Sequence, residues 1–127
     1  MPIVAVFAAV VAALIHVWFF VLESLQFDRP NIAARFGVQT PEQIAAVRPM
    51  AFNQGFYNLF LAVGIAGGLL LIATGNAVTG RPIVLFSCAC MVGAGVVLFS
   101  SNRRFAAGAA LQAVPPLIAI AVAFAFG

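Results

Sequence analysis

The sequence predicts an all-α integral membrane protein, a four-helix up-and-down bundle, and three observations lead to this fold class. The chain of 127 residues is 65% hydrophobic and 7% charged, whereas an average soluble domain has roughly 25% charged residues. Four apolar segments reach the roughly 20 residues that a helix needs to cross the hydrocarbon core. The connections between the later segments are short, and short connections place consecutive helices antiparallel. This composition excludes a water-soluble protein, because only lipid-facing helices need so little polar surface.

The first predicted span covers residues 2–27 of a single transmembrane domain, residues 1–127. Its apolar run is too long for a secretory signal peptide and no basic residue precedes it, so we expect this span to remain in the mature protein. The only long polar connection, residues 28–49, follows it.

This connection contains the signature of a short surface helix. Thr40 is placed as the N-cap, Pro41 occupies the first helical position, and Gln43 can return the capping bond. Pro49 removes one backbone donor, so we expect a kink or break just before the second span.

The remaining spans are predicted at residues 50–74, 82–101 and 106–126. Gly75, Asn76 and Gly80 can take the positive backbone angles of a tight turn between the second and third spans.

The arginines predict the orientation. Loops on one side of the membrane hold five arginines and the opposite loop holds one, and such a bias marks the cytoplasmic side. We therefore expect a multi-pass protein of the bacterial inner membrane with both termini outside the cytoplasm. Nucleic-acid binding is excluded, since it needs basic residues clustered on one exposed face. The five arginines on the predicted cytoplasmic side are Arg29, Arg35, Arg48, Arg103 and Arg104, and the arginine of the opposite loop is Arg81.

Cys88 and Cys90 predict neither a metal site nor a disulfide. Two residues apart on a helix, they point about 160° away from each other. The one histidine and the three acids of the chain, Glu23, Asp28 and Glu42, do not complete a metal-ligand set, and no cofactor-binding motif is present.

Gly64 and Gly68 lie one helical turn apart in the second span and allow another helix to approach closely. The partner helix belongs either to the same chain or, in the alternative, to a second copy in a homodimer. Membrane lipids are the other expected partners.

His16 and Glu23 are the candidate catalytic residues. Seven residues apart on a helix, they lie on one face, separated by about 10 Å along the axis. Ionisable groups inside a membrane are expensive to bury and mark candidate functional sites. In the alternative, His16 is a hydrogen-bonded core residue, and Glu23 extends to water at the membrane interface or pairs with Arg29 or Arg104.

Further polar residues are predicted at the same depth as Glu23, and a polar group without a partner in hydrocarbon costs several kcal/mol. We therefore expect a polar pocket open toward the cytoplasm, in which His16 and Glu23 face Asn53 and Tyr57. The alternative is that these side chains only hold helices together. The candidate ligand-binding residues are His16, Glu23, Asn53, Gln54, Tyr57, Asn58 and Gln112.

A family resemblance rests on these same residues. His16, Glu23 with the basic loop after it, and the stretch from Asn53 to Asn58 (NQGFYN) resemble the small four-span bacterial membrane proteins known as domain of unknown function 1304. The resemblance covers nearly the whole chain. It implies a multi-pass inner-membrane protein and no particular activity.

Two classes of function are compatible with these residues. In the first, the pocket binds, or acts on, a small lipophilic or amphipathic molecule, with Glu23 and His16 as acid/base or charge-recognising groups. In the second, the protein is a structural or accessory membrane subunit whose polar residues only specify helix packing.

Overall fold

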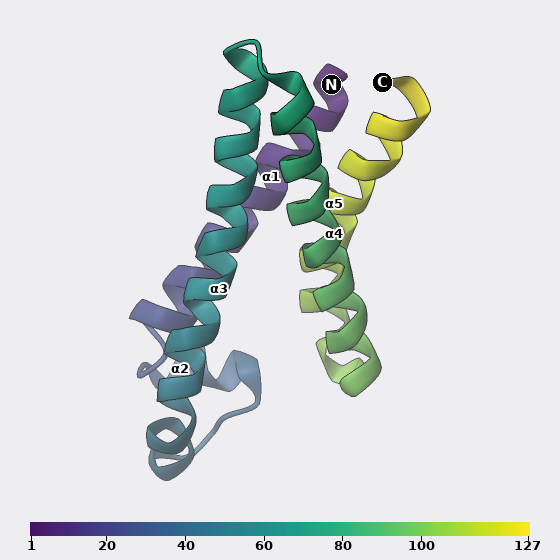
Figure 1. The fold of residues 1–127 in the computed structure, drawn as a ribbon. Helices are drawn as coiled ribbons and strands as arrows, with labels where there is room; N and C mark the ends of the chain where they lie inside the picture. Colours follow the sequence, from purple (N-terminus) through teal and green to yellow (C-terminus); the bar gives the residue numbers. More distant parts are fainter. The chain divides into compact units, whose positions relative to one another are not determined.

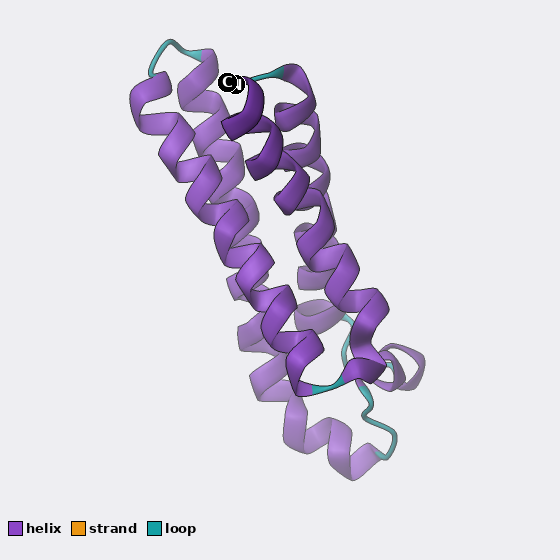
Figure 2. Ribbon diagram, turned by 90° about the vertical axis from the view of Figure 1, so that its right-hand side faces the viewer, coloured by secondary structure: helices purple, strands orange, loops and turns teal.

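The structure, a computed structural model, describes residues 1–127 and consists of helices joined by short loops, without strands (Figure 2). Four helical segments are long and apolar enough to cross a membrane. The predicted all-α class with four candidate spans is therefore confirmed. These segments are Ile3–Leu25, Pro41–Ala73, Ala77–Ser101 and Arg103–Phe126.

Figure 1 labels the helices in chain order. The elements are α1 (Ile3–Phe20), η1 (Val21–Leu25), α2 (Pro30–Ala33), η2 (Ala34–Phe36), α3 (Pro41–Ala73), α4 (Ala77–Ser101), η3 (Arg103–Phe105) and α5 (Ala106–Phe126).

The chain forms two compact units, each described here by itself. The bundle unit comprises Met1–Ile15 and Leu61–Gly127, and the hairpin unit comprises His16–Phe60. In the bundle unit, parts of α1 and α3 pack with α4 and α5. The fully buried core side chains there include Ile65, Val84 and Met91.

Small residues bring the helices of the bundle unit close together. A Cβ atom added to Gly68 would lie 2.8 Å from the carbonyl oxygen of Gly80, and one added to Gly64 would collide with the Ser87 hydroxyl. Gly64 and Gly68 therefore pack against α4 of the same chain, which is the intramolecular alternative. A homodimer through this face stays a prediction.

Arg81 holds the end of α5 in the bundle unit. Its guanidinium donates to the carbonyl oxygens of Gly127 (2.7 Å) and Ala123 (2.8 Å). The last carbonyls of a helix have no partner within the helix, so this side chain satisfies two of them. Gly127 also lies against Pro2, and both chain ends are at the same end of the bundle unit (Figure 1).

The helix that contains the predicted third span, residues 82–101, begins earlier than that span. The α4 helix begins at Ala77, with Asn76 as its N-cap accepting from the Thr79 backbone N–H at 3.3 Å. Gly75 supplies the positive backbone angle of the turn (φ 95°), whereas Gly80 is helical and allows the close approach to α3. The helix α5 (Ala106–Phe126) has the same bounds as the fourth predicted span, which stays a prediction of where the chain crosses the membrane.

The two cysteines lie on α4 as free thiols, and Cys88 is fully buried while Cys90 is partly exposed. The expectation that they form no bridge is confirmed.

The hairpin unit contains the long connection and both of its helix starts. The predicted capping box is confirmed: Thr40 Oγ1 accepts from the Gln43 backbone N–H (3.2 Å), and Gln43 Oε1 accepts from the Gln39 (2.9 Å) and Thr40 (3.3 Å) backbone N–H groups. Gly37 ends η2 with φ 79°.

Of the kink or break predicted at Pro49, the break is absent, because α3 continues from Pro41 to Ala73 without interruption. The kink stays a prediction. Ile44 and Val47 before the proline and Ala51 after it belong to one hydrophobic cluster, which includes Phe27. The segments before and after Pro49 pack on the same cluster, and this packing stabilises one continuous helix although Pro49 supplies no backbone donor.

Candidate functional site

Glu23 lies in a π-helical turn, Val21–Leu25, that directly follows α1. The turn is closed by the backbone N–H of Gln26, which donates to the carbonyl oxygen of Val21 at 3.0 Å. Short π-helical turns are rare and occur frequently at functional sites, since the wider turn changes the direction of the side chains. An ionisable residue in such a turn at the end of an apolar helix is therefore a candidate functional residue.

The Glu23 carboxylate is paired with an amide from α3. Asn58 Nδ2 donates to Glu23 Oε1 at 2.6 Å, and Asn58 is only 4% exposed. A hydrogen bond to an ionised acceptor is short and roughly twice as strong as a neutral one. Within the hairpin unit Glu23 forms no ion pair, so the alternative pairing with Arg29 is not formed. The structure thus brings together two of the predicted ligand-binding residues.

Ser24 and Gly55 hold the two helices together beside this pair. Ser24 Oγ donates to the backbone carbonyl of Phe52 at 2.7 Å. A Cβ atom at Gly55 would lie 3.0 Å from both Cβ and the backbone nitrogen of Ser24 and would collide with its hydroxyl. Gly55 therefore sets the helix separation at which Asn58 reaches Glu23.

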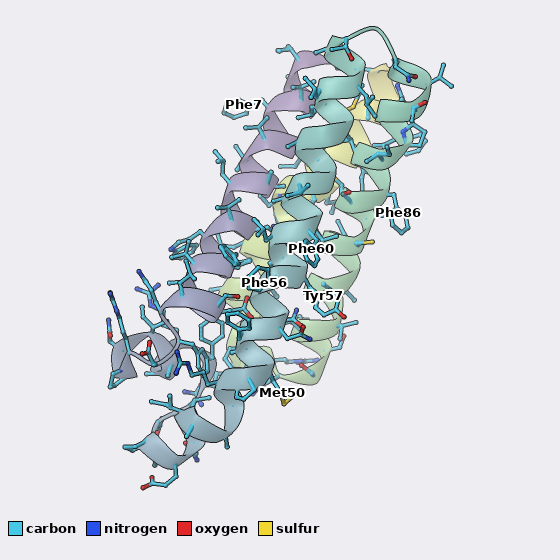
Figure 3. The ribbon with its side chains drawn as sticks, turned by 60° about the vertical axis from the view of Figure 1, so that its left-hand side comes forward. Phe7, Met50, Phe56, Tyr57, Phe60 and Phe86 are labelled. Atoms are coloured by element: carbon cyan, nitrogen blue, oxygen red, sulfur yellow. The ribbon has the colours of Figure 1, made fainter.

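A row of phenyl rings lies along α3 in the same unit. Phe52, Phe56 and Phe60 follow one another along α3 at four-residue spacing, with ring centroids 5.0 and 6.2 Å apart. Phe20 from α1 meets Phe56 edge-on, with centroids 5.0 Å apart. Figure 3 shows the side chains of Phe56 and Phe60 on α3. The hairpin unit therefore contains an aromatic contact between α1 and α3 in addition to the polar pair.

His16 is fully buried and contacts the Phe19 ring edge-on, with centroids 5.4 Å apart. Its neighbour Trp18 is partly exposed, and the Arg35 guanidinium lies 5.9 Å from the Trp18 ring centroid. The chain has no group of three or more histidine, cysteine, aspartate or glutamate side chains that could hold a metal ion.

The other predicted site residues do not join the polar pair. Asn53, Gln54 and Tyr57 are exposed, and Tyr57 keeps 58% of its surface accessible. The interpretation that Glu23 faces Asn53 and Tyr57 is therefore wrong. Neighbouring helical positions differ by about 100° in direction. Gly55 and Asn58 are on the face of α3 that packs against Ser24 and Glu23. Figure 3 shows Phe56 and Tyr57 on different sides of α3.

Gln112, the remaining predicted site residue, belongs to α5 in the bundle unit, where it is 8% exposed. Sequence reasoning missed Ser24 and Gly55 as members of the site. A signal for both was present, because a small residue lies next to Glu23 and a glycine lies in the middle of the NQGFYN stretch.

Comparison with known proteins identifies one family. A family model described as "Protein of unknown function (DUF1304)" matches residues 10–124. The matched range contains η1 and α3, which carry the candidate site, and most of the bundle unit. No curated protein and no solved structure matches the chain.

Proposed function

The chain belongs to the DUF1304 family of proteins of unknown function, and we propose that it is a bacterial inner-membrane protein that binds a small amphipathic molecule at Glu23 and Asn58. The observation that carries this proposal is the Glu23 carboxylate itself. It lies at the end of a candidate span, bonded to a neutral amide and without an ion pair in its unit.

The free hydrogen-bonding capacity of this pair indicates the chemistry of the ligand. Glu23 Oε1 accepts from Asn58, while Oε2 has no donor within the hairpin unit and the Glu23 side chain is partly exposed. An ionised carboxylate accepts hydrogen bonds and donates none. The complementary ligand therefore carries a donor, and a protonated amine also supplies the missing positive charge.

The aromatic row supports the apolar part of the same ligand. Phe20 comes three residues before Glu23 and Phe56 two residues before Asn58, and their rings are in contact. Phenyl faces attract both hydrocarbon and cations. A lipophilic amine combines a cationic head for Glu23 with an apolar tail for these rings.

The arginine distribution supports a position for this site near the cytoplasmic boundary. Arg29 and Arg35 follow Glu23 in the connection between the first two spans, and arginine-rich connections remain in the cytoplasm. A ligand then reaches Glu23 from the inner leaflet or the cytoplasm.

The structural alternative also has support, since Ser24 and Gly55 join α1 to α3 through close packing. A role in packing alone, however, would be served as well by a neutral side chain at position 23. Charged groups within a membrane are costly and are found mainly where they bind or transport something. The binding role therefore accounts for a carboxylate at this position.

Thermal unfolding in lipid nanodiscs tests the proposal with dodecylamine as the probe and dodecanol as its neutral counterpart. At about ten times the dissociation constant, dodecylamine is expected to raise the melting temperature of the wild type by about 3–5 °C. Glu23→Gln, which keeps the shape but removes the charge, should abolish this increase. Dodecanol should have little effect on either protein.

Glu42→Gln is the matched control. It makes the same chemical change at an exposed position of the first turn of α3, and it should leave the dodecylamine effect unchanged. An equal increase for the wild type and Glu23→Gln would show that the carboxylate does not bind the amine, and the proposal would fail.

A further inference from the structure

The bundle unit contains an open apolar groove between α4 and α5. Its volume is about 330 Å³. The groove is lined by Gly95, Val96 and Phe99 of α4 and by Ala106, Ala109, Ala110 and Ala113 of α5. No polar side chain is among them.

Small residues on both helices create this groove. A Cβ atom at Gly95 would lie 2.7 Å from the Cβ of Ala113 and 3.0 Å from the carbonyl oxygen of Ala109. The two backbones therefore meet at Gly95, and the short alanine side chains leave the space beside them open. Phe99 forms a larger wall and is 44% exposed.

A positive charge lies at the Phe99 end of the groove. The Arg103 guanidinium carbon is 5.9 Å from the centroid of the Phe99 ring, within the range of a cation–π interaction. Asn102 ends α4 and its side chain accepts from the Arg104 backbone N–H at 3.0 Å. Arg103 is thus next to the wall of the groove, just beyond the end of a candidate span.

We propose that this groove binds an anionic phospholipid, with one acyl chain along the alanine floor and the phosphate bound by Arg103. The groove is apolar along its length and has a cation at one end. A phospholipid has the complementary order of groups, an apolar chain followed by an anionic head. Basic residues next to grooves between membrane helices bind anionic head groups in this way. The site is separate from Glu23 and does not depend on the proposed function.

A second copy of the chain is the competing occupant, since small residues also favour helix–helix contact. A symmetric pair of parallel chains joined through this groove would place the two Arg103–Arg104 pairs at the same end of the interface. Four positive charges would then face one another without an acid in η3 or at either helix end. The charge of the groove therefore favours an anionic lipid.

Native mass spectrometry of the detergent-solubilised protein tests this site with dioleoyl phosphatidylglycerol and the zwitterionic dioleoyl phosphatidylcholine. We expect the wild type to bind phosphatidylglycerol about fivefold more tightly, the contribution of one basic residue near the membrane surface. Arg103→Gln should remove this preference, whereas Arg104→Gln should retain most of it. Equal losses in the two variants would show general surface attraction and would overturn the proposal.

A second pair of variants tests the acyl-chain part of the groove. Ala110→Leu fills the groove and should weaken binding of both lipids, while Ala107→Leu, at an exposed position that does not line it, should leave binding unchanged. Both positions are exposed, so neither leucine has to enter the core. Unchanged binding to Ala110→Leu would overturn the proposal. So would a dimer of the wild type that Ala110→Leu dissociates, because a second copy would then occupy the groove.

Discussion

The two units of the molecule hold their helices together by different means. In the bundle unit, backbones meet at glycine and alanine, as at Gly68 with Gly80 and at Gly95 with Ala109. In the hairpin unit, η1 contacts α3 through a carboxylate–amide pair and a hydroxyl–carbonyl bond, and α1 contacts α3 through an edge-on pair of aromatic rings. Small residues are the usual means of helix association in membranes.

This difference bears on the role of the Glu23 carboxylate. The chain packs most of its helices without charged side chains, so a carboxylate is not needed to join α1 to α3. Gly55 already allows the same close approach in the hairpin unit. The polar pair is an addition to a packing scheme that is complete without it, which supports a role in binding.

The largest expected effect tests the glycine packing of the bundle unit. A Cβ atom at Gly80 would lie 2.9 Å from the Ile72 backbone nitrogen and closer still to the Gly68 carbonyl oxygen. Because backbone atoms cannot move aside, Gly80→Ala should reduce the free energy of unfolding by about 3 kcal/mol. Thermal unfolding in detergent, followed by circular dichroism, measures this loss.

Gly67→Ala is the control for this variant. It makes the same change at a helical glycine with no atom within 4 Å of the added Cβ, and it should stabilise the protein by about 0.5 kcal/mol. Equal effects of the two variants would mean that close backbone contact does not hold the bundle unit together.

The next prediction concerns the polar pair of the hairpin unit. Asn58→Leu leaves the Glu23 carboxylate without its donor and should reduce the free energy of unfolding by about 2 kcal/mol. In the double variant Glu23→Leu with Asn58→Leu, no polar group is left unsatisfied, so stability should largely return. A double-mutant cycle by thermal unfolding measures this coupling. Additive losses would show that the bond of 2.6 Å contributes nothing to stability.

Local features of the chain could be predicted from the sequence. The capping box at Thr40 and Gln43, the four candidate spans and the extent of α5 all depend on residues that are close in sequence. The continuity of α3 through Pro49 could not be predicted, because it depends on packing against Phe27. The π-helical turn at Glu23 has no sequence signature that we recognise.

Gly55 provides a prediction of intermediate size. Gly55→Ala forces a methyl group against the Ser24 hydroxyl, which can rotate, and places it 3.0 Å from the Ser24 backbone nitrogen, which cannot. It should reduce the free energy of unfolding by about 1–2 kcal/mol. Ser24→Ala alone removes the bond to Phe52 and should cost about 1 kcal/mol. Combined, the two changes should cost less than their sum, because the hydroxyl that collides is gone. Thermal unfolding of the three variants tests this, and strict additivity would contradict the close contact.

The smallest expected effect separates the two faces of α3. Sequence reasoning could not choose between the face of Asn53 and Tyr57 and the face of Asn58, because polar residues recur on both at four-residue spacing. The choice depends on where Gly55 lets α1 approach, which is a tertiary property. The combined variant Asn53→Ala with Tyr57→Phe changes only exposed side chains and should alter the free energy of unfolding by less than about 0.5 kcal/mol. It should also leave the dodecylamine effect on the melting temperature unchanged. Asn58→Leu, one position after Tyr57, should reduce both the free energy of unfolding and the dodecylamine effect. Loss of the dodecylamine effect in the Asn53 and Tyr57 variant, together with its retention in Asn58→Leu, would place amine binding on the exposed face of α3 and leave Glu23 and Asn58 as a packing contact.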